Sequence, residues 1–366
     1  MRDQVSTNFT PKKRVTIKVV AREAGVSTQT VSRVLNNRVD VAPETRQRVK
    51  DVIQRLGYHP SAVARSLIQQ RSFALGVVTA GLDFLGPAQT LNGITQSAEA
   101  LGYSLILKEL PDLQSENIDL VLQSLLARQV DGIIWSVPQM GDNHDWIRTI
   151  LSQLAVPVLF LTTSPQTNIP SISIDNFLGG CIATQHLLDQ GYRKIGHLTG
   201  PLGWWEARAR RNGWQDTLAK SGISVIQDHW VEGNWSTSSG YAAGQKLLKQ
   251  YPGMDAVFVA NDQMALGLLK FAQEQSLSIP QDLAVVGFDG IPETAYYFPP
   301  LTTVRQDLNR LGCIAVEALI EVIERREQEF IERREGVIVS DSGTLQPQIV
   351  VRESSVLENV LQVVEN

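Results

Sequence analysis

Cysteine and long apolar runs are both scarce in this chain of 366 residues. The two cysteines, Cys181 and Cys313, lie far apart and lack the spacing of metal ligands, so we expect two buried thiols rather than a disulfide framework or a metal site. No uninterrupted apolar run approaches the ~20 residues that a membrane helix needs. Membrane-spanning classes are therefore excluded.

Several motifs are missing as well. The N-terminal segment "MRDQVSTNFTPKKR" has basic residues but no apolar stretch behind them, unlike a secretory signal peptide, so we expect a cytoplasmic protein. The chain also contains no phosphate-binding loop, metal cluster or nucleophile motif. We therefore expect no enzymatic activity and no cofactor.

The charge is unevenly distributed along the chain. The net charge is −5, but residues 1–70 carry 13 Lys and Arg against five Asp and Glu, a balance of +8 that leaves −13 for residues 71–366. A hydrophobic fraction of 43% and this length fit two or three globular domains. A basic head, residues 1–70, followed by an acidic body, residues 71–366, indicates that the head binds a polyanion.

The head has the pattern of three short helices. In "TIKVVAREAGV", Ile17, Val20 and Ala24 form one apolar stripe, Thr16 is a candidate N-cap, and Gly25 is suited to end the helix. The third helix, "PETRQRVKDVIQRLG", starts with Pro in its first turn and also closes on a glycine, Gly57.

The second helix has an unusual polar face. Ser27 can cap it, and its apolar stripe consists of Val31, Val34 and Leu35. The side chains left facing outward are short or hydrogen-bonding: Thr28, Gln29, Ser32 and Arg33. Gln pairs bidentately with adenine and Arg with guanine, which indicates a helix-turn-helix recognition helix rather than an ordinary surface helix.

The motifs "TIKVVAREAGVSTQTVSRVLN" and "VAPETRQRVKDVIQRLGYHPSAVARSL" resemble the headpiece and hinge of the lactose and galactose repressor family of bacterial transcription regulators. Further likenesses include "GPLGWWEARARRNGW", "VFVANDQMALG" and "PPLTTVRQD", so the resemblance covers roughly residues 15–353. It implies a regulator of a carbohydrate operon that binds a pseudopalindromic operator as a homodimer.

The resemblance also implies roles for single residues of the head. Thr28 and Gln29 match the two principal base-reading positions, and Arg33 matches a third. Positions that contact the DNA backbone or cap helices correspond to Thr16, Ser27, Thr30, Ser32 and Asn36. In the segment 61–71, Leu67 matches a leucine that the family wedges into the minor groove when its hinge helix orders on DNA. A flexible linker with one stray leucine is the alternative.

From Phe73 onward, apolar strands alternate with amphipathic helices. The strand candidates are "FALGVVT", "YSLILK", "DGIIWSV", "VPVLFLT", "KIGHLTG", "DAVFVAN" and "LAVVGFD". Continuous aliphatic runs separated by helices predict parallel sheets that are covered on both faces. The predicted fold class is therefore α/β: a helix-turn-helix headpiece followed by a two-lobed core of doubly wound parallel sheets, similar to periplasmic binding proteins.

Polar residues follow several of these strands, where ligands bind in open α/β sheets. Asp175 follows "SISI", Asn261 and Asp262 follow "VFVA", and Asp289 follows "VVGF"; we expect Asp262 to be a helix cap. The family resemblance implies effector contacts for Phe84, Pro87, Thr90, Ser124, Phe160, Arg210, Trp235, Asn261, Asp289 and Gln306. A core tryptophan is the competing interpretation of Trp235.

Three positions of the effector pocket depart from the family pattern, as Val19 does in the head. Trp204 and Glu206 stand where small hydroxyl residues line a pocket. Met140 stands where an acidic ligand is found, and replacement of that ligand by the nearby Asp142 is an open alternative. The mixture of Asp, Asn, Arg, Gln and Trp suits a carbohydrate, which has many hydroxyls and one apolar face. A galactoside is one candidate effector.

The predicted domains are a headpiece (15–60), a hinge (61–71), a core (72–352) and a C-terminal tail (353–366). Within the core, one lobe comprises about 72–160 and 305–335, and the other about 161–304 and 336–352. The apolar face of the tail predicts either packing on its own subunit or a helical bundle that makes a tetramer. A sugar-binding receptor without regulatory DNA binding is the alternative function.

Overall fold

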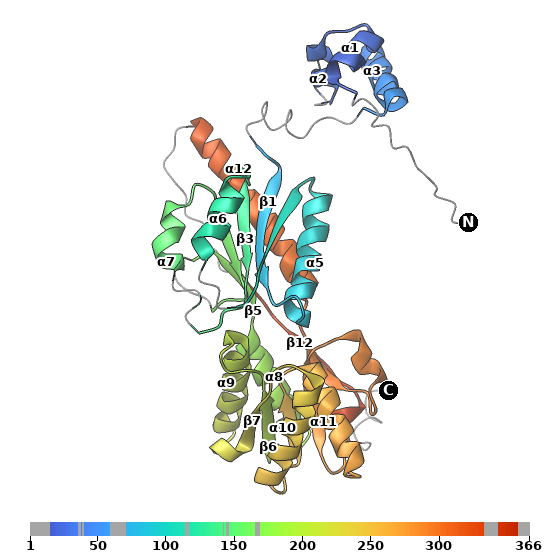
Figure 1. Cartoon of the computed structure of the whole chain (residues 1–366). Coiled ribbons are helices and arrows are strands. Elements are labelled where there is room, and N and C mark those ends of the chain that lie inside the picture. The colour runs from blue at the N-terminus through green and yellow to red at the C-terminus, as the bar shows by residue number, and fades with distance from the viewer. Residues whose placement is uncertain are drawn as a thin grey trace, which may run out of the picture. The chain divides into compact units, whose positions relative to one another are not determined.

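The computed structural model describes residues 15–35, 38, 40–58, 71–113, 117–141, 143, 146–164, 169–332 and 343–357. It divides into two compact units at residue 72 (Figure 1). Leu67 and all of the predicted hinge except Arg71 lie outside the described residues, as do Asn36 and the tail from residue 358. None of the helices in the described part combines the length and apolarity needed to cross a membrane.

The headpiece is a three-helix unit. Its helices are α1 (Ile17–Ala24), α2 (Thr28–Leu35) and α3 (Pro43–Leu56). Gly25 and Gly57 end α1 and α3 with φ of 65° and 59°, left-handed values that glycine adopts without a steric cost, as predicted. The core of this unit contains Val20, Ala21, Ala24, Val31, Val34, Val41, Val49, Val52 and Tyr58. The predicted stripes are confirmed, with Ile17 and Leu35 packed at the edge of this core.

The first lobe of the larger unit is a parallel six-stranded sheet in the order β11-β5-β4-β3-β1-β2. Its strands are β1 (Ala74–Ala80), β2 (Ser104–Leu110), β3 (Gly132–Ser136), β4 (Val158–Leu161), β5 (Ser171–Ile174) and β11 (Gly343–Leu345). Its helices are α5 (Leu85–Ala100), α6 (Ile118–Leu126), α7 (Ile147–Ile150) and α12 (Leu308–Glu332), with a 3₁₀ turn at Leu151–Gln153.

Both faces of this sheet are buried because successive side chains of a strand alternate in direction. Leu75 and Val77 of β1 pack with the cluster under α5 and α12, which lie side by side (Figure 1). Val78 and Ala80 pack on the opposite face with residues of α6 and α7. The aliphatic runs of β1, β3 and β4 therefore form strands that are buried on two sides, as the sequence predicts, whereas the edge strand β2 is only partly buried.

The second lobe repeats this architecture in the order β12-β10-β9-β8-β6-β7, with β12 antiparallel to β10 and the other pairs parallel. Its strands are β6 (Ile195–Thr199), β7 (Trp230–Glu232), β8 (Ala256–Val259), β9 (Ala284–Asp289), β10 (Thr302–Arg305) and β12 (Gln348–Val350). Its helices are α8 (Asn176–Asp189), α9 (Trp205–Lys220), α10 (Thr237–Gln250) and α11 (Asp262–Glu274). Three 3₁₀ turns complete the lobe, at Gln227–His229, Pro292–Tyr296 and Glu353–Ser355.

The chain passes between the lobes three times, and two crossings differ from the expected boundaries. Strand β5 belongs to the first sheet, because Phe160 of β4 pairs with Ser171. The first crossing therefore lies after Ile174 rather than after residue 160. Strand β11 also pairs with β5 in the first sheet, so the last crossing lies between Leu345 and Gln348 rather than near residue 335.

The segment assigned to the start of the tail is part of the second lobe. Ser354 is fully buried, and its Oγ accepts from Thr302 N at 2.8 Å and donates to the Val285 carbonyl at 2.6 Å. Ser355 is also buried and lies 2.7 Å from Thr302 Oγ1. The boundary at residue 353 is therefore wrong, because these hydroxyls complete the hydrogen bonds of β9 and β10.

The two cysteines lie where helices cross. Cys181 of α8 has its Sγ 3.6 Å from the Gly213 carbonyl of α9, and Cys313 of α12 has its Sγ 3.5 Å from the Gly93 carbonyl of α5. Both thiols are free and half-buried, not fully buried as expected, because one side of each helix remains in contact with solvent. Burial raises the pKa of the Cys181 thiol above its ordinary value, which keeps it protonated at neutral pH.

Candidate functional site

The headpiece presents short polar side chains on α2. Thr28, Gln29 and Arg33 are exposed, as predicted. Thr30 is half-buried, and so is Ser32, which is expected to face outward but follows the fully buried Val31. The exposed face at the start of α2 therefore consists of donors and acceptors that can reach the edges of DNA bases.

Ser27 caps α2 as predicted. Its Oγ accepts from the Thr30 backbone N–H at 3.1 Å and lies 3.0 Å from Thr30 Oγ1. Thr16 is the N-cap residue of α1, but among the described residues its hydroxyl makes no capping hydrogen bond; its carbonyl accepts from Val20 N at 3.2 Å. The hydroxyl of Thr16 is thus not committed to the helix that it precedes.

Arg33 forms an exposed ion pair with Asp40 at 3.5 Å. Exposed pairs of this kind contribute only about 0–1 kcal/mol because water and salt screen them. The guanidinium can therefore exchange Asp40 for a stronger partner at low cost.

A cleft lies between the two lobes of the core. It encloses about 680 Å³, including its opening to solvent. The sequence-predicted residues that line it are Phe84, Pro87, Trp204, Glu206, Arg210, Trp235, Asn261, Asp289 and Gln306. Nine expected effector contacts from both lobes and from the segment that joins them are therefore brought together.

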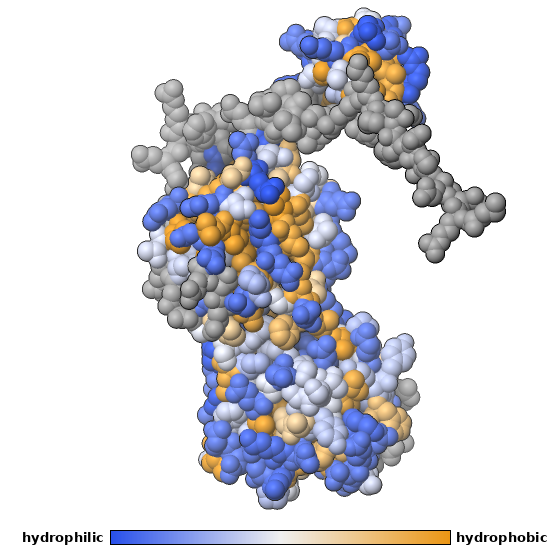
Figure 2. All heavy atoms as spheres, viewed as in Figure 1, coloured by the Kyte–Doolittle hydropathy of each residue, from blue (hydrophilic) through white to orange (hydrophobic). Residues whose placement is uncertain are grey.

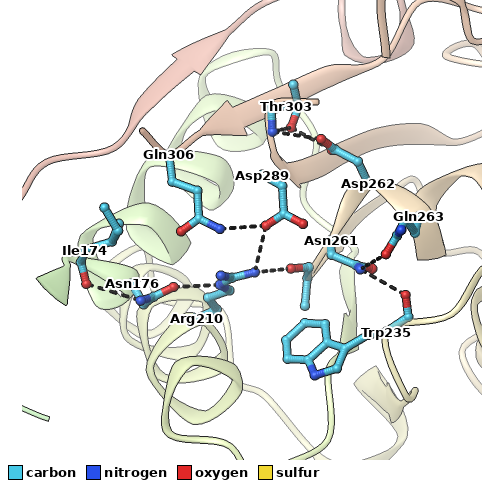
Figure 3. A network of polar contacts seen from close by, with 12 residues as sticks. Ile174, Asn176, Arg210, Trp235, Asn261, Asp262, Gln263, Asp289, Thr303 and Gln306 are labelled. Carbon is cyan, nitrogen blue, oxygen red and sulfur yellow. Dashed lines mark hydrogen bonds and ion pairs between the residues drawn. The ribbon is translucent and has the colours of Figure 1, made fainter. Parts of the chain in front are cut away.

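A buried polar network centred on Arg210 forms one wall of the cleft (Figure 3). Arg210 Nε donates to Asn176 Oδ1 at 2.8 Å, and Nη1 donates to the Ala260 carbonyl. Nη1 also lies 3.5 Å from Asp289 Oδ1, which accepts from Gln306 Nε2 at 2.7 Å. Four parts of the chain, α8, the β8–α11 connection, β9 and the β10–α12 connection, thus hold one guanidinium in place.

Burial sets the protonation equilibria of this network. Burial lowers the pKa of Arg210 from its ordinary value, while the carboxylates of Asp289 and Glu206 oppose that change. Burial also raises the pKa of Asp289, and Arg210 and Gln306 act against it. The guanidinium additionally lies over the Phe288 ring, 3.7 Å from its centre, which stabilises the cation where water is excluded.

Asn261, rather than Asp262 as expected, caps α11. Asn261 caps α11 by accepting from Met264 N at 3.0 Å, and its Nδ2 donates to the Trp235 carbonyl at 2.9 Å, although it also lines the cleft. Asp262 is not the cap: its carboxylate accepts from Gly290 N, Ile291 N and the Thr303 hydroxyl. Asp262 therefore fixes the loop that follows Asp289.

Aromatic rings form a second wall. Phe84 of the first lobe meets Trp204 edge to face at 5.2 Å, and Trp204 meets Trp235 in the same way at 5.8 Å. Trp235 is 8% exposed and belongs to both the cleft wall and the core of the second lobe, so the two interpretations of this residue are not exclusive. Gly200 leaves room for its ring, since a Cβ there would lie 2.1 Å from it.

Three of the six described non-glycine residues with a positive φ line the cleft. Thr162, Trp235 and Asp289 have φ of 54°, 74° and 110°, in the left-handed region that disfavours side chains, and all three line it. Strained residues persist where surrounding contacts hold them, most often at functional sites.

Comparisons with known proteins match this architecture. The family model "Bacterial regulatory proteins, lacI family" matches residues 16–61, and the model of the periplasmic binding protein-like domain matches residues 184–355. The chain is 36% identical over 310 residues to the lactose operon repressor of Escherichia coli (strain K12), with 85% of each protein covered. This chain belongs to the LacI family of bacterial regulatory proteins.

Solved structures of LacI-family proteins extend the match to three dimensions. The lac repressor dimer bound to operator and the anti-inducer ONPF has a TM-score of 0.81 and 34% identity, covering 94% of this chain and 100% of that chain. The complex of the regulator CelR with cellobiose has a TM-score of 0.66 and 28% identity, covering 93% and 100%. The chain is thus a DNA-binding transcriptional regulator with an effector-binding core, and it is not an enzyme.

Three of the family-derived effector positions lie outside the cleft wall as the structure describes it. Thr90 is fully buried and donates to the Gly86 carbonyl at 2.9 Å, where α5 and α12 approach each other closely. Phe160 is fully buried against Trp146, 6.0 Å away, on the α6 and α7 face of the sheet. Ser124 lies on α6, which covers the same face. In this LacI-family chain these side chains belong to the body of the first lobe.

Other cleft residues escaped the sequence analysis. Asn176 is 3% exposed and binds Arg210, and it follows Asp175 at a strand end, where the same rule could have found it. Asp175 instead caps α8 by accepting from Leu178 N at 2.8 Å. The remaining lining residues are mostly apolar or near the crossings: Leu85, Gly86, Pro138, Thr162, Ile174, Trp205, Gln263, Leu308 and Leu311.

Met140, expected near a ligand contact, instead takes part in a connection between the lobes. It forms an antiparallel β-bridge with Trp204. Gly141 N donates to the Gly203 carbonyl at 3.2 Å, and Trp205 N donates to the Gln139 carbonyl at 2.9 Å. This pair of backbone hydrogen bonds ties the two lobes together beside the cleft, while Asp142 lies outside the described residues.

Proposed function

We propose that this LacI-family chain is a repressor of a carbohydrate operon, and that a sugar bound in the cleft relieves repression. The observation that carries the proposal is the Arg210 network beside an aromatic wall, with the guanidinium 5.5 Å from the centre of the Trp235 ring. A planar guanidinium and carboxylates suit the hydroxyls of a sugar, and tryptophan rings suit its apolar face. The cellobiose complex of the similar regulator CelR supports a carbohydrate, and a galactoside remains one candidate.

The α2 surface supports the DNA-binding half of the proposal. Thr28 and Gln29 are exposed at the N-terminal end of α2, the end that reads base edges in helix-turn-helix proteins, and Arg33 follows one turn later. We assign backbone contacts or helix capping to Thr16, Ser27, Thr30, Ser32 and Asn36. We assign the minor-groove wedge to Leu67, which lies outside the described residues together with Asn36.

Exposed apolar side chains on the core support a homodimer. Tyr296 and Phe298, between β9 and β10, are 88% and 89% exposed. Hydrophobic residues also gather on the visible face of the first lobe in Figure 2, and Leu107 of β2 is 44% exposed. A C2 dimer buries one patch against its own copy and matches a pseudopalindromic operator. Assembly into a tetramer is the alternative, and it would depend on residues 358–366.

Effector control follows from the position of the cleft between two lobes. Phe84 and Leu308 come from the first lobe, whereas Arg210 and Trp235 come from the second. A ligand that contacts both lobes favours the arrangement in which both sets of contacts form, and it shifts the equilibrium by that difference in affinity.

The test is fluorescence anisotropy of the full-length protein on a labelled palindromic operator of the family type, at fixed salt, with a panel of galactosides, glucosides and cellobiose. We expect specific binding that one class of sugar weakens at least tenfold. Binding that no sugar alters would refute the carbohydrate effector but retain the DNA-binding function. Absence of specific binding to any such operator would refute the proposed DNA recognition.

A further inference from the structure

Glu206 is the one acidic side chain of the described cleft wall that the protein leaves partly unsatisfied. It lies in the first turn of α9 and is 9% exposed. Its Oε2 is buried and has no hydrogen-bond partner among the described residues. A buried carboxylate oxygen without a donor is costly, and such groups in native proteins call for an explanation.

The two arginines nearest to Glu206 form their hydrogen bonds and ion pairs with other groups. Arg210, one turn further along α9, donates to Asn176 and to the Ala260 carbonyl, and it pairs with Asp289. Arg208 donates to the carbonyls of Leu202 and Gly203, both at 2.7 Å. Each guanidinium is therefore held away from the free oxygen by contacts that shape the wall itself.

The charge balance of the wall restricts what can satisfy Glu206. Arg210 and Asp289 form a neutral pair, and Arg208 acts on Glu206 only through space, so no cation donates a hydrogen bond to Oε2 of an ionised Glu206. An ionised carboxylate only accepts hydrogen bonds. A phosphate or carboxylate placed against it would add like-charge repulsion in a water-poor site.

The side chains next to Glu206 indicate which kind of ligand supplies the missing hydrogen-bond donor. Trp204 precedes Glu206 in the chain and, with Phe84 and Trp235, forms the apolar side of the cleft. A group that brings O–H donors on a body with an apolar face fits both features. The hydroxyls of a neutral sugar ring meet this requirement.

We propose that Glu206 is a specificity-determining residue of the cleft, accepting hydrogen bonds from hydroxyls of a neutral sugar and rejecting sugar acids and sugar phosphates. This inference rests on the proposed function, because it names the chemistry of the effector in the same cleft. It explains why α9 has a glutamate in its first turn, where a buried charge would otherwise destabilise the fold.

The experiment is isothermal titration of the full-length protein at about pH 8, where Glu206 is ionised, with cellobiose, lactose and glucose, and with the matched lactobionic acid, glucose 6-phosphate and glucosamine. The variants are Glu206→Gln, which keeps the shape, and Glu206→Ala, which removes the carboxyl group. The control is Glu232→Gln, which removes one negative charge from an exposed site of the same lobe that accepts from Leu202 N. Melting curves verify that each variant folds.

We expect a neutral sugar to bind, the acid and phosphate not to bind, and Glu206→Gln to weaken binding of that sugar by about 10- to 100-fold, the usual range for a hydrogen bond to a charged group. Glu232→Gln should leave the affinity unchanged. Equal affinity of wild type and Glu206→Gln for a neutral sugar would overturn the inference and leave the sugar effector intact. Tighter binding of the acid, the phosphate or glucosamine would overturn it too. If no carbohydrate binds, the proposed effector class is wrong and this inference falls with it.

Discussion

The buried pair of Arg210 and Asp289 should be strongly coupled in stability. Arg210 Nη1 and Asp289 Oδ1 are 3.5 Å apart, and both side chains are at least nine-tenths buried. At that distance the attraction is about 5 kcal/mol for an effective dielectric constant of about 20, before the cost of desolvation. Asp289→Asn should therefore cost about 2–3 kcal/mol by leaving the guanidinium uncompensated.

Arg210→Met should cost more, about 4 kcal/mol, because it also removes donors to Asn176 and Ala260. The loss of unfolding free energy in the double variant should be about 2 kcal/mol smaller than the sum of the two single losses, because neither charge then lacks its partner. Urea denaturation of the core at pH 7.5 measures all four corners of this cycle. Losses that add to within about 0.5 kcal/mol would refute the coupling.

Three further predictions concern the site and its supports. Burial raises the pKa of Glu206 to about 7 from 4.5, so its ionisation should destabilise the fold by at most about 3 kcal/mol. This destabilisation is absent below pH 4.5 and complete above pH 7. The urea midpoints of Glu206→Gln and wild type should therefore diverge between these two pH values. Gly213→Ala puts a Cβ 2.2 Å from the Phe177 carbonyl and 2.8 Å from Cys181 N, so it should push α8 away from α9. The free energy of unfolding should fall by about 1–3 kcal/mol. An unchanged melting temperature would contradict this close approach of the two helices. Gln29→Ala should lower specific operator affinity by about 1–3 kcal/mol without changing the melting temperature or binding to unrelated DNA, which anisotropy and thermal melting test together.

Features that depend on neighbours in the sequence were predictable. Gly25 and Gly57 end their helices, and Ser27 caps α2, because each acts on a backbone group within a few residues. The long aliphatic strands were predictable for a similar reason, since burial on both faces leaves a continuous apolar run. The sheet to which β5 and β11 belong was not predictable, because strand pairing is decided by contacts with partner strands that are distant in the sequence.

Some features of the cleft were predictable from the sequence, and others were not. Arg210, Asp289 and Gln306 came from family positions, and the structure brings them together in one network. Thr90 and Phe160 came from the same source, yet the side on which a helix or strand residue emerges depends on packing that the sequence does not display. Roles also depend on partners in space: Asp262 binds a loop 28 residues away rather than its own helix.

The threading of the core has a consequence for protein synthesis. The first sheet is completed by β11 (Gly343–Leu345) and covered by α12 (Leu308–Glu332), so it cannot close until the ribosome has released nearly the whole chain. The headpiece is continuous in sequence and has its own core, and domains of this kind form during translation. A chain interrupted before residue 305 thus carries a finished DNA-binding unit with no completed effector core. Because such a fragment has no complete cleft, an effector could not control any DNA contact that its headpiece makes.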